Sequence, residues 1–190
     1  MKYLFVFAIL LGILGCSVSV DKEGKKSVSE SQENLYDYDV EARIVSMGIT
    51  LSEPPPPVAN YVNSVRTGNL VFMAGKGPTK PEGGYITGKV GADLTVEEGY
   101  EAARLTATAQ LSALKGEIGD LNNVVRIVKV LGMVNCTNDF ENQPEVINGF
   151  SDVMVEVFGD RGKHARAAVG MASLPRGIAV EIEFIVEVRD

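Results

Sequence analysis

The last 27 residues of the chain alternate apolar and polar side chains, as β-strands do when one face is buried. The second half of this stretch shows the cleaner alternation, and its apolar face consists of Ile178, Val180, Ile182, Phe184, Val186 and Val188. The opposite face carries three carboxylates, Glu181, Glu183 and Glu187. We therefore expect a strand with one face in the core and a charged face away from it.

A shorter β-patterned run, residues 165–172, precedes this strand. Pro175 and Gly177 lie between the two runs and favour a turn, so we expect residues 164–190 to form a hairpin. We expect Ala167, Val169 and Met171 to face the core, and Arg166, Ala168, Gly170 and Ala172 to share the charged face. Such a face fits a small-molecule pocket, and it also fits an ordinary solvated sheet surface, which is the more common case.

Five further elements are predicted upstream. Asp39 caps a short helix that ends at Gly48, and the capping box Thr95–Glu98 begins a longer one that ends near Gly116. The remaining three are a hairpin over residues 60–75 with Gly68-Asn69 at its turn, a strand over Val124–Val134, and a helix from Asn142 to Gly159.

This order predicts an α+β fold in which two helices pack on one face of a mixed sheet. If Ile127 and Leu131 face the helices, the central strand is also apolar on its other face, through Val124, Val128, Val130 and Val134. A sheet that is apolar on both faces needs cover on both. We therefore expect a closed homo-oligomer that buries the second face.

The first 36 residues differ in character from the rest. Lys2 precedes an apolar run over residues 3–14, which ends in Gly15-Cys16, as a lipoprotein signal peptide does. We expect residues 1–15 to be removed, Cys16 to carry lipid, residues 16–36 to tether the protein, and residues 37–190 to form the domain. The tether is too polar to order itself. A secretory signal cut elsewhere is the alternative.

Composition narrows the range of partners. The chain has 190 residues and a formal net charge of −7, which argues against nucleic acid as a partner. One histidine and scattered carboxylates do not have the spacing of a metal site, and we expect no cofactor. Cys136 is unpaired once Cys16 is lipidated.

The C-terminal string H-A-R-A-A-V-G-M-A-S-L-P-R-G-I-A-V-E-I-E resembles the signature of the RidA/YjgF family. The likeness covers residues 51–188, and three internal strings, among them Q-P-E-V-I-N-G-F-S-D, resemble a longer branch of the family. It implies a chorismate-mutase-like fold, a homotrimer with pockets between subunits, and hydrolysis of reactive enamines or imines to keto acids and ammonia. Combined with the signal peptide, it places that domain in the periplasm of a bacterial envelope, held to the membrane by lipid.

The resemblance also implies roles for single residues. Arg166 would hold a substrate carboxylate, and Glu181 would position or activate water. Tyr61 would line the pocket and handle a proton, while Gly75, Asn148 and Ala168 would contact substrate. A structural ion pair is the alternative for Arg166 and Glu181, and helix-end hydrogen bonding is the alternative for Asn148.

The chain departs from the family pattern at the pocket. His164 and Asn60 stand where the family has proline, Ala74 where many members have serine, and Ala168 where many have cysteine. The substrate of the best-known members therefore does not transfer directly. A non-catalytic carboxylate-binding trimer and a ribonuclease are the two other functions that we weigh.

Overall fold

The computed structural model describes residues 18–20, 26–28, 34–53 and 60–189. The chain divides into two units, Met1–Asn34 and Leu35–Asp190. Cys16, the residues before it and the four prolines at positions 54–57 lie outside the described residues. The proposals about lipidation and processing therefore rest on sequence alone.

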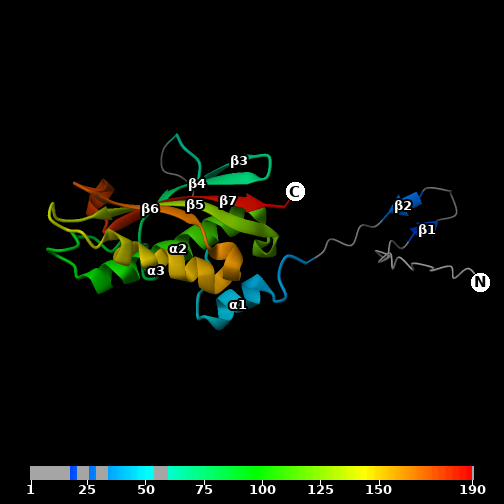
Figure 1. Cartoon of the computed structure of the whole chain (residues 1–190), viewed down its shortest axis with the longest axis horizontal. Coiled ribbons are helices and arrows are strands. Elements are labelled where there is room, and N and C mark those ends of the chain that lie inside the picture. The colour runs from blue at the N-terminus through cyan, green and yellow to red at the C-terminus, as the bar shows by residue number, and fades with distance from the viewer. Residues whose placement is uncertain (1–17, 21–25, 29–33, 54–59, 190) are drawn as a thin grey trace, which may run out of the picture. The chain divides into compact units, whose positions relative to one another are not determined.

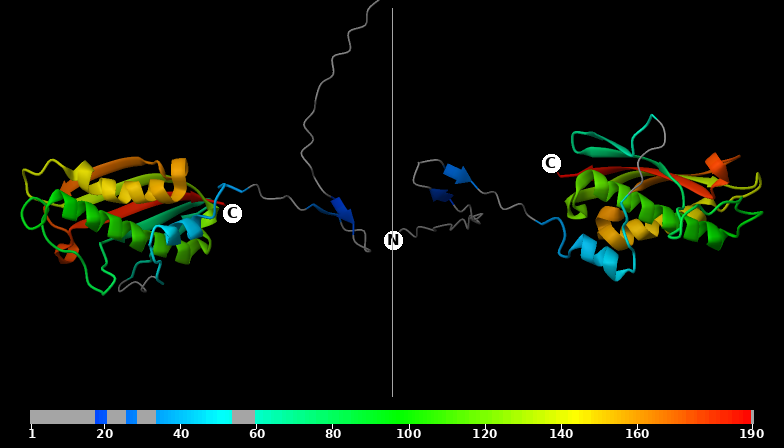
Figure 2. Two further views of the ribbon diagram at one scale, coloured as in Figure 1. Left: turned by 90° about the horizontal axis from the view of Figure 1, so that it is seen from below. Right: turned by 180° about the vertical axis from the view of Figure 1, so that it is seen from behind.

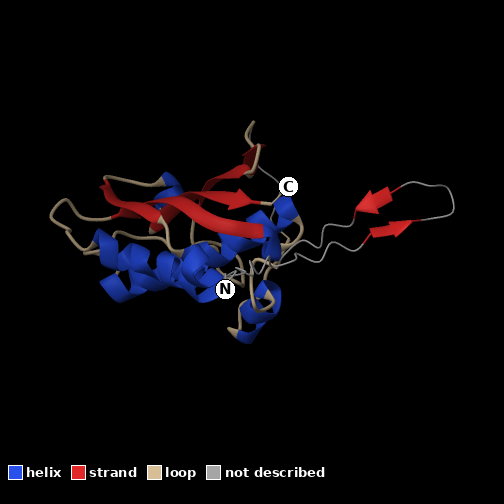
Figure 3. Ribbon diagram, turned by 45° about the vertical axis from the view of Figure 1, so that its right-hand side comes forward, coloured by secondary structure: helices blue, strands red, loops and turns tan. Residues whose placement is uncertain are grey.

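The second unit is an α+β domain in which one five-stranded sheet carries the helices on one side (Figures 1 and 3). Its α-helices are α1 (Val40–Ser46), α2 (Val96–Ile118) and α3 (Gln143–Phe158), and short 3-10 helices span Leu121–Asn123, Gly159–Gly162 and Pro175–Gly177. Its strands are β3 (Ser64–Thr67), β4 (Leu70–Lys76), β5 (Val124–Asn135), β6 (Ala165–Met171) and β7 (Val180–Val188). The predicted fold class is confirmed.

The predicted helix signals act as expected. The Thr95 hydroxyl accepts from the Glu98 amide, and the Glu98 carboxylate accepts from the Thr95 amide, which completes the capping box. Asp39 caps α1 through the amide of Ala42, at 2.6 Å. Both α2 and α3 pack along the same face of the sheet and against each other, as the view from below shows (Figure 2).

The sheet order is β3-β4-β7-β5-β6. β7 pairs antiparallel with β4 on one side and with β5 on the other, whereas β6 pairs parallel with β5. The expected C-terminal hairpin is therefore wrong, because β5 lies between β6 and β7. The chain reaches β6 from β5 through α3, and a helical crossover of this kind places two strands side by side in parallel.

The alternation along residues 178–188 is confirmed, and all six of its predicted core residues are buried, five of them on β7. On β5 the faces differ from the expectation, because the pairing shifts between Val124 and Arg126 and again between Ile127 and Lys129. These irregularities leave Val124, Ile127, Val130 and Val134 buried under the helices, while Leu131 faces the other way, in register with Glu183.

The face of the sheet away from the helices still bears apolar side chains. Val65, Phe72 and Val169 are exposed by 57%, 42% and 38%. Phe72 lies in register with Val65 on one side and with Ile185 on the other. We call the apolar part of this surface the open face, and it consists of Val65, Phe72, Leu131, Met133, Val169 and Ile185.

The first unit contains β1 (Val18–Val20) and β2 (Lys26–Val28), which pair antiparallel. This short ladder lies in the segment for which we expected no regular structure. In the described part of the chain, no helix combines the length and apolarity that crossing a bilayer requires.

Candidate functional site

Arg166 lies on β6, in register with the buried Val130, so its side chain points toward the helices. Its Nη1 donates to Oδ1 of Asn148 and to Oγ of Ser151, both at 2.9 Å. Its Nη2 donates to the carbonyl of Pro144 in a longer contact of 3.4 Å. All three acceptors belong to α3, so the helix fixes the guanidinium from one side.

Glu181 lies on β7, on the face away from the helices, since its neighbours Val180 and Ile182 are both in the core. A side chain at position 75 would overlap Oε1 of Glu181, so glycine is what lets the carboxylate lie against β4. Burial, and then the nearby charge of Glu183, raise the pKa of Glu181. Among the described residues, Glu181 has no ion-pair partner.

The predicted site residues therefore form two groups in one chain. Arg166, Asn148 and Ala168 lie on the helix side of the sheet, and Gly75 and Glu181 lie on the other side. The expectation that Arg166 and the carboxylates share a face is wrong. The two faces of β6 are exchanged relative to the prediction, because Ala168 is in register with Gly132, beneath Ile147.

Tyr61 precedes β3 and is 54% exposed. The segment that carries it runs beside β4, since the amide of Ala74 donates to the carbonyl of Asn63 at 2.9 Å. The backbone thus brings Tyr61 near the group of Gly75 and Glu181, and away from Arg166.

Two residues at the site were not singled out by sequence reasoning. Ser151 lies three residues after Asn148, so both side chains emerge from the same side of α3 toward Arg166. This spacing was visible in the sequence once Asn148 had been named. Gln110 is fully buried in α2 and donates to the carbonyls of Ala74 and Ile182, at 2.9 and 2.5 Å.

Metal and thiol chemistry have little support within the described residues. No group of three or more His, Cys, Asp and Glu side chains there could hold a metal ion. Cys136 is a free, buried thiol, 4% exposed, near the side-chain amide of Gln143.

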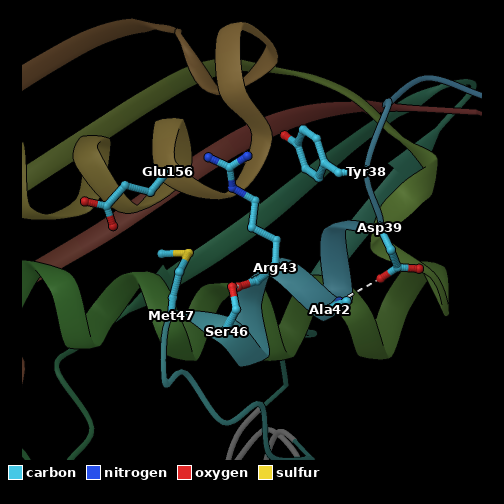
Figure 4. Close-up of a pocket in the computed structure, with 7 residues that line it drawn as sticks. All are labelled: Tyr38, Asp39, Ala42, Arg43, Ser46, Met47 and Glu156. Atoms are coloured by element: carbon cyan, nitrogen blue, oxygen red, sulfur yellow. Dashed lines mark hydrogen bonds between the residues drawn. The ribbon is translucent and has the colours of Figure 1, made fainter.

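A separate hollow of about 620 Å³ lies beside α1 (Figure 4). Arg43 extends between Tyr38 and Glu156 there, with its guanidinium carbon 4.6 Å from the centre of the Tyr38 ring. The hollow is wide open, and none of the predicted site residues lines it. The candidate chemistry is therefore at the sheet and not at this hollow.

Comparison with known proteins identifies the fold. The family model described as "YjgF/chorismate_mutase-like, putative endoribonuclease" matches residues 41–184. The chain belongs to the YjgF/RidA family. It is 42% identical to Protein TCP17 of Trypanosoma cruzi over 152 residues, which cover 80% of this chain and 95% of that protein.

Two further relatives of this family member bear on structure and activity. A crystal structure of the protein Atu1372, of unknown function, from Agrobacterium tumefaciens superimposes with a TM-score of 0.73 at 40% identity, covering 79% of this chain and 94% of the other. A 2-iminobutanoate/2-iminopropanoate deaminase of Escherichia coli is 28% identical over 141 residues, covering 74% of this chain and 97% of the deaminase. The family thus includes a relative with a named activity, the Escherichia coli deaminase, and a relative of unknown function, Atu1372.

Proposed function

We propose that the protein hydrolyses small imines or enamines that carry a carboxylate, giving a keto acid and ammonia. The observation that carries this proposal is the set of hydrogen-bond partners of Arg166. Its guanidinium is fixed on α3 by neutral oxygen acceptors, and among the described residues it has no carboxylate partner. A fixed cation of this kind is suited to a ligand carboxylate, which it can hold with two parallel hydrogen bonds.

Glu181 supplies the proton transfers in this proposal. A carboxyl group whose pKa is raised exchanges protons more readily near neutral pH than an ordinary glutamate does. Water adds to the imine carbon while Glu181 takes one of its protons. That proton passes to the imine nitrogen, which gives a carbinolamine. Glu181 then moves the hydroxyl proton of the carbinolamine to the same nitrogen, so that the C–N bond breaks, ammonia leaves and the keto group forms.

The two halves of the site lie on opposite faces of one sheet, so one chain cannot place both groups on one substrate. We infer that Arg166 of one subunit meets Glu181 and Gly75 of another, in a homotrimer with its pockets between subunits. The apolar open face supports this, because burying it against another copy removes apolar area from water. Similarity to the Escherichia coli deaminase supports the same chemistry.

The test uses an amino-acid oxidase to generate imines from several amino acids, with semicarbazide to trap them. We expect the protein to lower the yield of trapped imine, and Arg166→Ala to abolish this effect. Arg43→Ala, which removes an exposed arginine of α1 away from the candidate site, is the matched control. If wild-type protein leaves the trapped imine unchanged with every amino acid, deamination is ruled out.

The same proteins distinguish a purely binding role. Thermal stabilisation by keto acids that disappears in Arg166→Ala, without any imine turnover, would identify a carboxylate-binding protein. Ribonuclease activity has weaker support, since the net charge of −7 disfavours RNA and the chain has a single histidine.

For the location, we propose that the chain is cut before Cys16, that Cys16 carries lipid, and that the domain acts in the periplasm. This rests on the sequence of residues 2–16 alone. Expression in a bacterium with a clickable fatty acid should label the wild type and leave Cys16→Ser unlabelled. Labelling of both proteins, or of neither, would contradict it.

A further inference from the structure

Arg166 is one end of a chain of hydrogen bonds that runs through Ser151 on α3 to His164. Ser151 Oγ, which accepts from Arg166, lies 3.0 Å from Nε2 of His164. The other ring nitrogen of His164, Nδ1, lies 2.7 Å from the carbonyl of Gly162. The order is therefore Arg166, Ser151, His164 and the backbone of Gly162.

The direction of each bond in this chain follows from what each atom can do. A carbonyl only accepts, so Nδ1 of His164 must carry the proton that points to Gly162. In a neutral ring Nε2 is then an acceptor, and the Ser151 hydroxyl donates to it. The lone pairs of Ser151 are left for Arg166. The neutral ring thus fixes the orientation of the Ser151 hydroxyl, with its lone pairs directed to accept the hydrogen bond from the guanidinium.

This arrangement determines which donors of Arg166 remain for a ligand. Both hydrogens of Nη1 are taken, by Asn148 and Ser151. Nη2 is occupied on one side only, by the 3.4 Å contact with Pro144, and Nε has no acceptor in the described part of the chain. The edge formed by Nε and Nη2 is therefore the one available to a carboxylate, which matches that spacing with its two oxygens.

The surroundings of His164 keep its ring neutral. Burial lowers the pKa of His164, the bond to Gly162 opposes this, and the positive charge of Arg166 lowers it further. The other charged groups in the adjoining hollow of about 370 Å³ are Arg126 and Lys163, also cations.

Two acidic side chains close in sequence to this network, Asp160 and Asp152, are engaged with other groups. Asp160 is paired with Lys163 at 2.7 Å. Asp152, which follows Ser151 on α3, accepts from the hydroxyl of Tyr100. A protonated His164 would therefore gain a charge beside Arg166, and its Nε2 would donate to Ser151 instead of accepting from it.

We propose that Ser151 and His164 are positioning residues that hold the Arg166 guanidinium with its Nε–Nη2 edge free for a substrate carboxylate, with the His164 ring acting as a hydrogen-bond acceptor. The part that concerns substrate rests on the proposed function. The part that concerns the geometry of Arg166 does not, and it can be measured separately.

The geometry is tested by NMR on the full chain. His164 is the only histidine, so the imidazole ¹⁵N signals report one ring without assignment. At neutral pH we expect the proton on Nδ1. We also expect the Arg166 guanidinium to rotate slowly in the wild type and faster in Ser151→Ala. Ser46→Ala, whose hydroxyl bonds to Arg43 on α1, should leave both signals unchanged.

The functional part is tested by titrating 2-oxobutanoate at several pH values. Binding should weaken as the pH falls through the pKa of His164, and Ser151→Ala should weaken it about fivefold at pH 8. His164→Gln keeps an acceptor near the position of Nε2 but does not titrate, so it should bind at pH 8 and lose the pH dependence.

The outcomes separate the two proposals. A proton on Nε2, or a guanidinium that rotates equally fast with and without the Ser151 hydroxyl, overturns the positioning role. If the NMR results are as expected but the protein binds no keto acid at any pH, the positioning role is supported. In that case the proposed substrate class is wrong. Binding in His164→Gln that still falls at acid pH shows that another group controls the pH dependence and overturns the role of His164.

Discussion

At the scale of single residues, the planar guanidinium of Arg166 has enough donors to bond to α3 and still leave donors for a ligand. Three acceptors on α3 use one side of it and leave the other side open. A lysine at this position would have a single nitrogen for the same acceptors and for a ligand.

We therefore expect Arg166→Lys to weaken keto-acid binding about tenfold or more, with little loss of stability. Calorimetric titration with 2-oxobutanoate measures the affinity, and urea unfolding checks that the fold is intact. Arg43→Lys makes the same change on α1, away from the candidate site, and should bind as the wild type does. Equal affinity in Arg166→Lys and the wild type would show that the planar fork is not used.

The raised pKa of Glu181 leads to a prediction of how the stability of the fold depends on pH. Because burial and Glu183 raise its pKa, the folded chain binds more protons than the unfolded chain between the two pKa values. The contribution of Glu181 to stability is therefore present in full below its unfolded pKa, and it is lost as the pH rises through its folded pKa.

In a Phe72→Glu background, which keeps the chain monomeric so that no second Arg166 faces Glu181, the further change Glu181→Gln should accordingly raise stability near pH 7.5, and the difference should shrink toward pH 4. Thermal unfolding over this pH range measures it. Glu145→Gln, in the exposed first turn of α3, is the matched control. If the stability gained by Glu181→Gln stayed constant with pH, it would have a cause other than titration of this carboxyl.

At the scale of elements, local signals in the sequence predicted local structure well. The Thr95–Glu98 capping box, the Gly68-Asn69 turn and the alternation along residues 178–188 all act through neighbours in the chain, so they could be recognised without the fold.

Pairing between distant elements could not be predicted in the same way. The expected hairpin failed because β6 and β7 are adjacent in sequence while each pairs with β5. The shifts in β5 reversed the side of Leu131, since one extra residue moves a side chain to the other face. The candidate site residues were named from the family resemblance, and their split between two faces of the sheet follows from these long-range pairings.

Gln110 of α2 forms hydrogen bonds to the irregular part of the β4–β7 pairing from the helix side of the sheet. The register shifts between Met73 and Lys76, and the Gln110 amide donates to the carbonyls of Ala74 and Ile182 at this point. These carbonyls flank the positions of Gly75 and Glu181. Gln110 thus ties α2 to the part of the sheet that carries half of the candidate site.

Gln110→Leu should therefore cost about 1–3 kcal/mol in the free energy of unfolding, because the buried carbonyl of Ile182 and the half-buried carbonyl of Ala74 lose a donor. It should also speed amide hydrogen exchange at Gly75. Thr106→Val is the control, since Thr106 is equally buried on α2 but bonds only within the helix, to Ala102. Unchanged stability and exchange in Gln110→Leu would mean that the irregularity holds without the amide.

At the scale of the whole molecule, the open face and the divided site point to the same assembly. Helices cover one face of the sheet (Figure 3), and the other keeps Val65, Phe72 and Val169 exposed. A second copy placed on this face would bury them, and it could also bring its own Arg166 toward Glu181. Stability and activity then depend on one interface.

We expect the wild-type chain to run as a trimer in size-exclusion chromatography with light scattering, and Phe72→Glu to run as a monomer. A charge at the centre of an apolar interface has to be desolvated without a partner, which disfavours association. Val45→Glu places the same charge on α1, where Val45 is 72% exposed, and should leave the trimer intact. If the Phe72→Glu monomer kept its imine-hydrolysing activity, the site would be complete within one chain and the division between subunits would be wrong.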